Sequence, residues 1–315
     1  MWPYIATANR ACSLLYSYIK KHSSGIWLLP VNICPDVPLT FCLANVQFQF
    51  VDIDPETLCI NIVECQKLIE NSTYDYTGII YVRTYGVCKN TRISFESLKS
   101  ISNDFLIIDD RCLCVPEDNP SFYGADMILY STGHCKQLDF GMGGMACYSN
   151  ETLYEIDPAL KYDGLDETTL YNEAYKKELP LSAIPQGWLK MEYFWEPVEY
   201  IDKIKKSIPQ RIKQRKAINA IYKNNLPSDI QFPDEFNDWR YNIRVSPSIK
   251  NALLHQLFTK GLFASNHYHS VNRLFDTRKF PVSDRLFSEV INLFNDQYYT
   301  EDKAFLTCQV INEFL

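Results

Sequence analysis

Length, composition and charge limit the classes of protein to which the chain can belong. Its 315 residues, 46% hydrophobic and 14% aromatic, suffice for one large domain and a smaller companion. The net charge of -7 argues against nucleic acid as a partner, because phosphate binding needs a basic surface. No apolar run approaches 18 residues and no signal peptide opens the chain, so we expect a cytoplasmic protein with no membrane partner.

The cysteines indicate neither disulfides nor a metal site. Eleven cysteines are scattered without a CxxC pair, which fits a reducing compartment. Cys112 and Cys114 are separated by a single residue, which is not the spacing of zinc ligands. We therefore expect no metal.

The first half of the chain alternates apolar runs with helical patterns. Helices are predicted at Ala11–Lys21, around Leu39–Ala44, at Ile62–Glu70 and at Ile93–Ser100, and strands at Ile26–Leu29, Phe48–Val51, Gly78–Val82, Phe105–Ile108 and Asp126–Tyr130. Apolar strands separated by helices are typical of a parallel sheet covered on both faces. Right-handed crossovers would place the carboxyl ends of these strands at one edge, where ligands of such sheets bind.

A change of pattern near residue 180 indicates a second domain. A long helix is predicted from Pro197 to Asn224, with a kink or restart at Pro209, and its basic run Lys203–Lys216 is interpreted as a solvated face. The elements expected after it are a strand at Tyr241–Val245, a helix at Ile249–Lys260, a short strand near Leu262–Ala264, and helices near Ser283–Phe294 and Glu301–Phe314. We predict a large α/β domain over residues 1–190. Residues 191–315 would form the linking helix and a small α+β domain.

Two groups of polar residues follow predicted strands. Asp109 and Asp110 come directly after one strand, and the loop Ser131–Gly144, which carries Lys136, comes directly after another. Taken singly, the aspartates are a common strand-ending turn and the lysine is a common solvated loop residue. Both, however, would lie at the same sheet edge, where a carboxylate needs a cationic partner and a lysine can form an imine.

This combination matches the needs of pyridoxal phosphate (PLP). The cofactor requires a lysine for the imine, a carboxylate that keeps the pyridine nitrogen protonated, and hydroxyl and helix N-terminal amide groups for the phosphate. Residues Thr7–Ala11 open the first predicted helix and are candidates for the phosphate site. The glycines form neither GxGxxG nor a P-loop, so the loop does not indicate a nucleotide triphosphate.

Five blocks in order resemble the DegT/DnrJ/StrS-type sugar-nucleotide aminotransferases, a PLP-dependent family. The matching blocks are Leu29–Asp54 with its "vDiDp" turn, Ile79–Gly86 ("pVHlyG"), Ile107–Arg111 ("viEDaA"), Ser131–Gly144 ("SFhxxK…GeGG"), and the Phe263–His269 and Phe280–Leu293 region. The resemblance implies fold type I, with a mostly parallel seven-stranded sheet flanked by helices. It also implies a homodimer with shared active sites.

The resemblance assigns roles by position. Lys136 would form the imine with PLP and then move the proton between substrate and cofactor. Asp110 would pair with the pyridine nitrogen, with Asp109 one residue away as the alternative. Ser131 and the backbone of Asn9 and Arg10 would bind the phosphate. The list of implied contacts is completed by Cys34 and Leu113 at the cofactor and by His267 and Tyr268 at the substrate.

Several positions depart from the family pattern. The "SGT" of the phosphate site is altered at Ala8–Arg10, the stacking aromatic position falls near Ile33–Cys34, the histidine of "VHlyG" is Arg83, and Leu113 replaces a usual Gln or His. The reaction implied is transfer of an amino group from an amino acid, glutamate in the family, to a nucleotide-linked keto sugar. Two alternatives stay open: another PLP reaction such as dehydration, and a relative that binds PLP weakly or not at all and has a regulatory or structural role.

Overall fold

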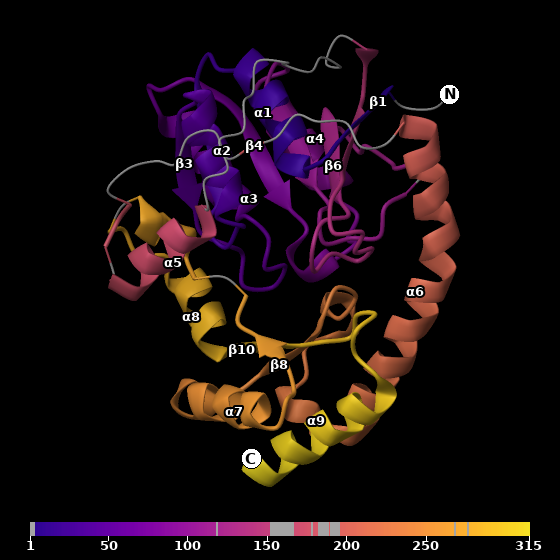
Figure 1. Cartoon of the computed structure of the whole chain (residues 1–315). Coiled ribbons are helices and arrows are strands. Elements are labelled where there is room, and N and C mark those ends of the chain that lie inside the picture. The colour runs from indigo at the N-terminus through magenta and orange to yellow at the C-terminus, as the bar shows by residue number, and fades with distance from the viewer. Residues whose placement is uncertain are drawn as a thin grey trace.

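A computed structural model of the chain contains two sheets (Figure 1), and it describes residues 4–117, 119–151, 167–177, 179–181, 189, 196–267, 269–275 and 277–315. The larger sheet has seven strands in the order β1-β7-β6-β5-β4-β2-β3. Only β7 is antiparallel to its neighbours in this sheet. The predicted fold class, a mostly parallel sheet flanked by helices, is thus confirmed.

The large sheet is built from short apolar strands. Its strands are β1 (Tyr4–Ala8), β2 (Ile26–Pro30), β3 (Phe48–Val51), β4 (Tyr76–Val82), β5 (Leu106–Asp110), β6 (Met127–Ser131) and β7 (Gly144–Tyr148). Its helices are α1 (Ala11–Lys21), α2 (Asp36–Ala44), α3 (Ile62–Asn71) and α4 (Arg92–Ile101), with the single turn η1 (Thr84–Gly86). The edge strand β1 and its neighbour β7 are rich in small residues, and the sequence pattern did not indicate them.

Helices cover both faces of this sheet. Leu14 of α1 and Phe41 of α2 pack on one face, together with Ile108 and Leu129 of the strands. Side chains of α3, α4 and α6 pack on the other face, with Ile107 and Ile128 among the strand residues there. Neighbouring residues of one strand therefore face different layers, as the pleat of a strand requires.

The helix α6 (Pro197–Asn225) runs alongside both sheets and connects them (Figure 1). It is continuous through Pro209, so the expected restart there is wrong. The basic run within it is not wholly solvated either, because the Arg215 side chain is buried with 6% exposure. Among the described residues, no helix has the length and apolar character that a bilayer span requires.

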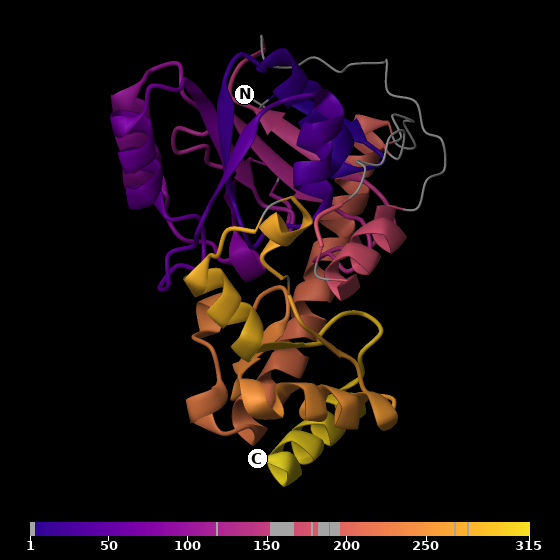
Figure 2. The ribbon, with the colours of Figure 1, turned by 90° about the vertical axis from the view of Figure 1, so that its left-hand side faces the viewer.

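The smaller sheet lies at the other end of the molecule in both views (Figures 1 and 2). Its strands are β8 (Tyr241–Arg244), β10 (Val290–Leu293) and β9 (Ala264–Ser265), packed on α7 (Pro247–Thr259), α9 (Glu301–Phe314) and the second half of α6. The helix predicted over Ser283–Phe294 is wrong in its second half: α8 (Pro281–Glu289) ends and β10 begins at Val290. The four residues of β10 are buried as the central strand, and this pairing outweighs the helical pattern before them.

The chain returns to the large sheet between the two strands β9 and β10. Asp52, just after β3, accepts hydrogen bonds from the amides of Val282 and Ser283 at 3.0 Å each, and so caps the start of α8. The helix α5 (Glu167–Lys177) packs near the same return segment, η5 (Val271–Leu274). The expected domain boundary near residue 190 falls outside the described residues.

Candidate active site

A cavity of about 550 Å³ opens at the carboxyl edge of the large sheet. This volume lies within the range of small-molecule and cofactor sites. Six residues that the sequence singled out for a cofactor line it: Asn9, Arg10, Cys34, Asp110, Ser131 and Lys136. His134, two residues before Lys136, also lines it. The cavity lies on the sheet face that α1 and α2 cover, since residues of both helices form its wall.

The two adjacent aspartates face opposite sides of the sheet. Asp110 lines the cavity, accepts a hydrogen bond from the Cys112 amide at 2.9 Å and is 6% exposed. Asp109 is fully buried on the other side. Arg83 donates hydrogen bonds to both of its oxygens at 2.7 and 2.8 Å, and Arg111 donates a third at 2.9 Å. Asp109 is therefore occupied by two guanidinium groups, and only Asp110 is available to a ligand in the cavity.

Lys136 lies in a tight loop after β6. Cys135, the residue before it, has a left-handed backbone with φ of 61°. Asp139 folds the loop by accepting from the amides of Cys135 at 3.0 Å and Gly141 at 2.9 Å. Ser131 accepts from the Gly133 amide at 3.2 Å, so its hydroxyl lies at the rim of the same loop.

The electrostatics of the cavity couple the lysine to the nearby carboxylate. Burial raises the pKa of Asp110, against the hydrogen bonds from Cys112 and the charge of Lys136. Burial lowers the pKa of Lys136, but the negatively charged forms of Cys112, Cys34 and Asp110 raise it, and its pKa lies above the usual value. Burial raises the pKa of Cys112 well above its ordinary range, so this thiol is protonated near neutral pH. The charged partner of Lys136 is then Asp110.

The first turn of α1 forms another wall of the cavity. Asn9, Arg10 and Ala11 all line it, and the turn contains no acidic residue. The amides of a helix's first turn lack partners within the helix and carry a partial positive charge, so they favour an anion. The start of α1 packs directly against Gly144 of β7. Only glycine fits there, because a Cβ at this position would lie 2.4 Å from the Ala11 nitrogen.

Two of the expected site residues that the structure describes do not line the cavity. Leu113 is buried in the core on the opposite face of the sheet. The His267 ring lies 4.7 Å from Trp239 and 5.5 Å from Tyr85, between centroids. Burial, followed by the charge of Lys136, lowers the pKa of His267 well below its usual value, so it is neutral at pH 7. Tyr268 lies outside the described residues.

Other residues reach this site from parts of the chain that carried no local signal. Tyr171 of α5 lines the cavity, and among the described residues it is the only phenylalanine, tyrosine or tryptophan that does. Arg215 and Trp239 donate hydrogen bonds to the backbone of the Lys136 loop. Arg215 lies within a run of basic residues, and Trp239 precedes a short strand. Nothing in either pattern distinguishes these residues from surface or core positions.

The fold and the cavity together define an α/β enzyme in which a lysine and a carboxylate meet at the carboxyl edge of the sheet. The family model of the DegT/DnrJ/EryC1/StrS aminotransferase family matches residues 41–305, and the chain belongs to this family. The expected family and enzyme class, an aminotransferase, are thus confirmed. A search of curated proteins found no match.

Solved structures share the fold at low sequence identity. A DegT DnrJ EryC1 StrS aminotransferase from Brucella abortus is 16% identical, with a TM-score of 0.72 over 99% of this chain and 86% of that one. The sugar aminotransferase CalS13 from Micromonospora echinospora is 16% identical, with a TM-score of 0.70 over 98% of this chain and 87% of that one. NtdA from Bacillus subtilis, with the bound cofactor PMP, is 14% identical, with a TM-score of 0.70 over 99% and 74%.

Proposed function

We propose that the chain is a PLP-dependent sugar aminotransferase that transfers the amino group of an amino acid, glutamate, to a nucleotide-linked keto sugar. One observation carries the proposal: Lys136 and Asp110 face the same cavity as the first turn of α1. CalS13 is named a sugar aminotransferase and NtdA binds PMP, the amino form of PLP, which supports the acceptor class and the cofactor. We propose that the enzyme works as a cytoplasmic homodimer.

The residues of the cavity fit PLP in kind and in place. Bound PLP supplies an electron sink for the carbanion that forms when a substrate loses its Cα proton. Lys136 offers an amine for the aldehyde and Asp110 a carboxylate for the pyridine nitrogen. Ser131 and the start of α1 offer hydroxyl and amide donors for the phosphate.

Asp110 holds a proton on the pyridine nitrogen. Its carboxylate is buried, and burial already disfavours the negative charge. With PLP bound, Asp110 would face the protonated ring nitrogen, and the two opposite charges would stabilise each other. Asp109 does not compete for this role, because Arg83 and Arg111 hold it on the other side of the sheet.

Lys136 both anchors the cofactor and moves a proton. Its Nζ must lose a proton before it can attack an aldehyde. Because its pKa is raised, the deprotonated fraction is small near neutral pH, and the attack becomes faster as pH increases. With PLP bound, Nζ would be positioned to move the proton between the substrate carbon and the cofactor. His267 is neutral, and its ring packs against Trp239 and Tyr85 rather than lining the cavity.

Absorbance of the purified protein with added PLP tests this proposal. We expect a visible band in the wild type that Lys136→Ala abolishes, while Lys89→Ala, at a half-exposed ion pair, keeps it. Borohydride reduction followed by peptide mass spectrometry should locate the cofactor on Lys136. Glutamate should then bleach the band and release 2-oxoglutarate. A wild type without the band at saturating PLP refutes the enzyme proposal and favours the regulatory alternative. A band without amino transfer favours dehydration or another PLP reaction.

A further inference from the structure

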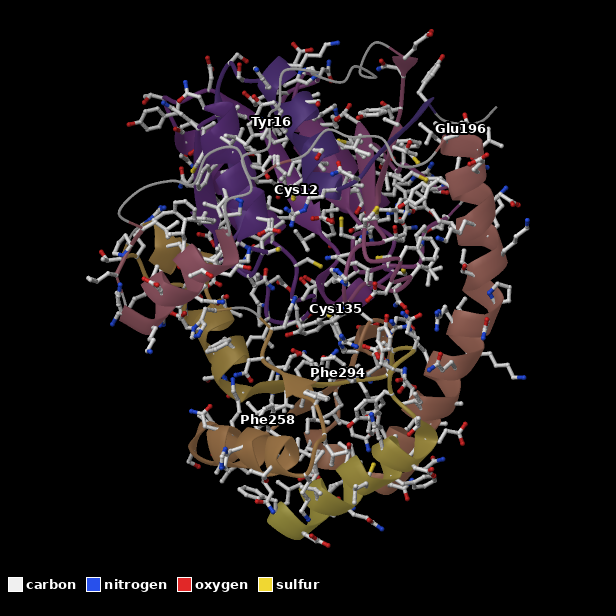
Figure 3. All side chains as sticks on the ribbon, in the orientation of Figure 1. Cys12, Tyr16, Cys135, Glu196, Phe258 and Phe294 are labelled. Atoms are coloured by element: carbon white, nitrogen blue, oxygen red, sulfur yellow. The ribbon has the colours of Figure 1, made fainter. Side chains whose placement is uncertain are left out.

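Three consecutive backbone carbonyls around Lys136 receive hydrogen bonds from outside their loop. The indole nitrogen of Trp239 donates to the Cys135 carbonyl at 2.6 Å. One terminal nitrogen of Arg215 donates to the carbonyls of Lys136 at 3.2 Å and Gln137 at 3.4 Å. The loop follows β6 of the large sheet, whereas both donors come from α6 and the segment that enters the small sheet. Figure 3 shows Cys135 between these two parts of the molecule.

The two donors form one rigid unit, which we call the carbonyl clamp (Arg215 and Trp239). Arg215 also donates to the Trp239 carbonyl at 2.6 Å and to the side-chain oxygen of Asn295. The Trp239 ring is parallel to the ring of Tyr85, with 3° between their planes. Both clamp residues are buried, with 6% and 5% exposure. The donor side chains are therefore largely shielded from water, which makes their hydrogen bonds costly to break.

The Lys136 loop needs such support. A residue other than glycine in the left-handed region costs about 1 kcal/mol or more, and Cys135 has φ of 61°. Within the loop, the Lys136 amide reaches the Gly133 carbonyl only at 3.4 Å, which is long for a hydrogen bond. Asp139 holds two amides of the loop, but the carbonyls next to Lys136 are held by the clamp. Burial lowers the pKa of Arg215 to about 10, so it remains a cationic donor at neutral pH.

We propose that Arg215 and Trp239 are positioning residues that hold the backbone of residues 135–137 and thereby place the Lys136 amine in the cavity. The inference rests on the proposed function only where it concerns the attachment of PLP. The helix α6 and the segment that leads into the small sheet then determine where the reacting amine lies, since both donors come from them.

The test removes one hydrogen-bond donor of the clamp and keeps an aromatic side chain in its place. Trp239→Phe deletes the indole N–H, and Trp27→Phe is the matched control, because the Trp27 indole donates to the His22 carbonyl at 3.0 Å within the core. Without cofactor, we expect amide hydrogen exchange across residues 133–138 to be about tenfold faster in Trp239→Phe and unchanged in Trp27→Phe. With PLP, attachment to Lys136, followed by absorbance and borohydride trapping, should slow by about tenfold in Trp239→Phe alone.

A second variant guards against misfolding. Arg215→Lys keeps a cation, but its one amine cannot replace both terminal nitrogens of Arg215, of which one donates to the loop and the other to Trp239. We expect its exchange and attachment rates to lie between those of the wild type and Trp239→Phe. Equal exchange in Trp239→Phe, Trp27→Phe and the wild type overturns the inference. So does faster exchange with an unchanged rate of attachment. If the wild type never attaches PLP, the proposed function fails, and exchange alone then decides whether the clamp holds the loop.

Discussion

The two adjacent aspartates should respond oppositely to the same chemical change. Asp109→Asn removes the carboxylate that faces two buried guanidinium groups, at 2.7 to 2.9 Å. Leaving such charges without their anion costs about 3 to 5 kcal/mol. Asp110→Asn keeps the oxygen that accepts from the Cys112 amide and removes a charge that burial already disfavours. Lys136 loses its charged partner in this variant but can release its proton, so we expect a stability loss of only about 1 to 2 kcal/mol.

Turnover should be lost in Asp110→Asn and kept in Asp109→Asn, the reverse of the order expected for stability. Asp110→Asn leaves the pyridine nitrogen without its carboxylate, and we expect PLP to attach to Lys136 but turnover to fall about 100-fold, the scale of one lost electrostatic contact in a transition state. Asp109→Asn should retain turnover per folded molecule at low temperature, because its side chain lies outside the cavity.

Urea denaturation and single-turnover kinetics on the two variants give both measurements. The unfolding midpoint reports stability, and release of 2-oxoglutarate per bound cofactor reports function. If Asp110→Asn proves as destabilised as Asp109→Asn, the assignment of the two faces is refuted. Loss of turnover in Asp109→Asn with full stability would contradict it equally.

Three further predictions concern other parts of the structure. Asp52→Ala removes the acceptor for two amides at the start of α8 and should cost about 1 to 2 kcal/mol by urea denaturation; an unchanged midpoint would show that water replaces it. The hydrogen bond with Cys114 lowers the pKa of Cys88 to about 7, so its alkylation should rise with pH through that value and slow in Cys114→Ala; a rise confined to pH above 8 would contradict this. Gly143→Ala should destabilise the fold by about 1 to 3 kcal/mol, because φ is 114° and the new Cβ would lie 2.3 and 2.5 Å from two hydroxyl oxygens. Gly133→Ala is the control and should be as stable as the wild type, because the nearest atom to its new Cβ would lie 3.5 Å away.

The elements that the sequence predicted correctly are those with a local signal. Apolar runs bounded by helices marked β2 to β6, because strands covered on both faces are apolar throughout. β1 and β7 escaped this pattern, since each is rich in small residues and depends on its neighbour for pairing. β10 was hidden directly after α8, where only pairing with β8 and β9 distinguishes a buried strand from a longer helix.

The candidate site divides in the same way. Lys136, Ser131 and the aspartate pair could be placed at one sheet edge from the sequence, because parallel strands share their carboxyl ends. Choosing Asp110 over Asp109 required the tertiary structure: the pleat sends the two side chains apart, but only the packed helices show which face is hollow.

By itself, the sequence determined the fold class and the lysine at the sheet edge, since both follow from the order of apolar runs and turns along the chain. The tertiary structure alone decided what holds that lysine and what surrounds it. Arg215 lies 79 residues from Lys136 along the chain, Trp239 lies 104 residues from Cys135, and Tyr171 comes from a separate helix. Contacts over such separations arise from packing between elements, which no local periodicity encodes.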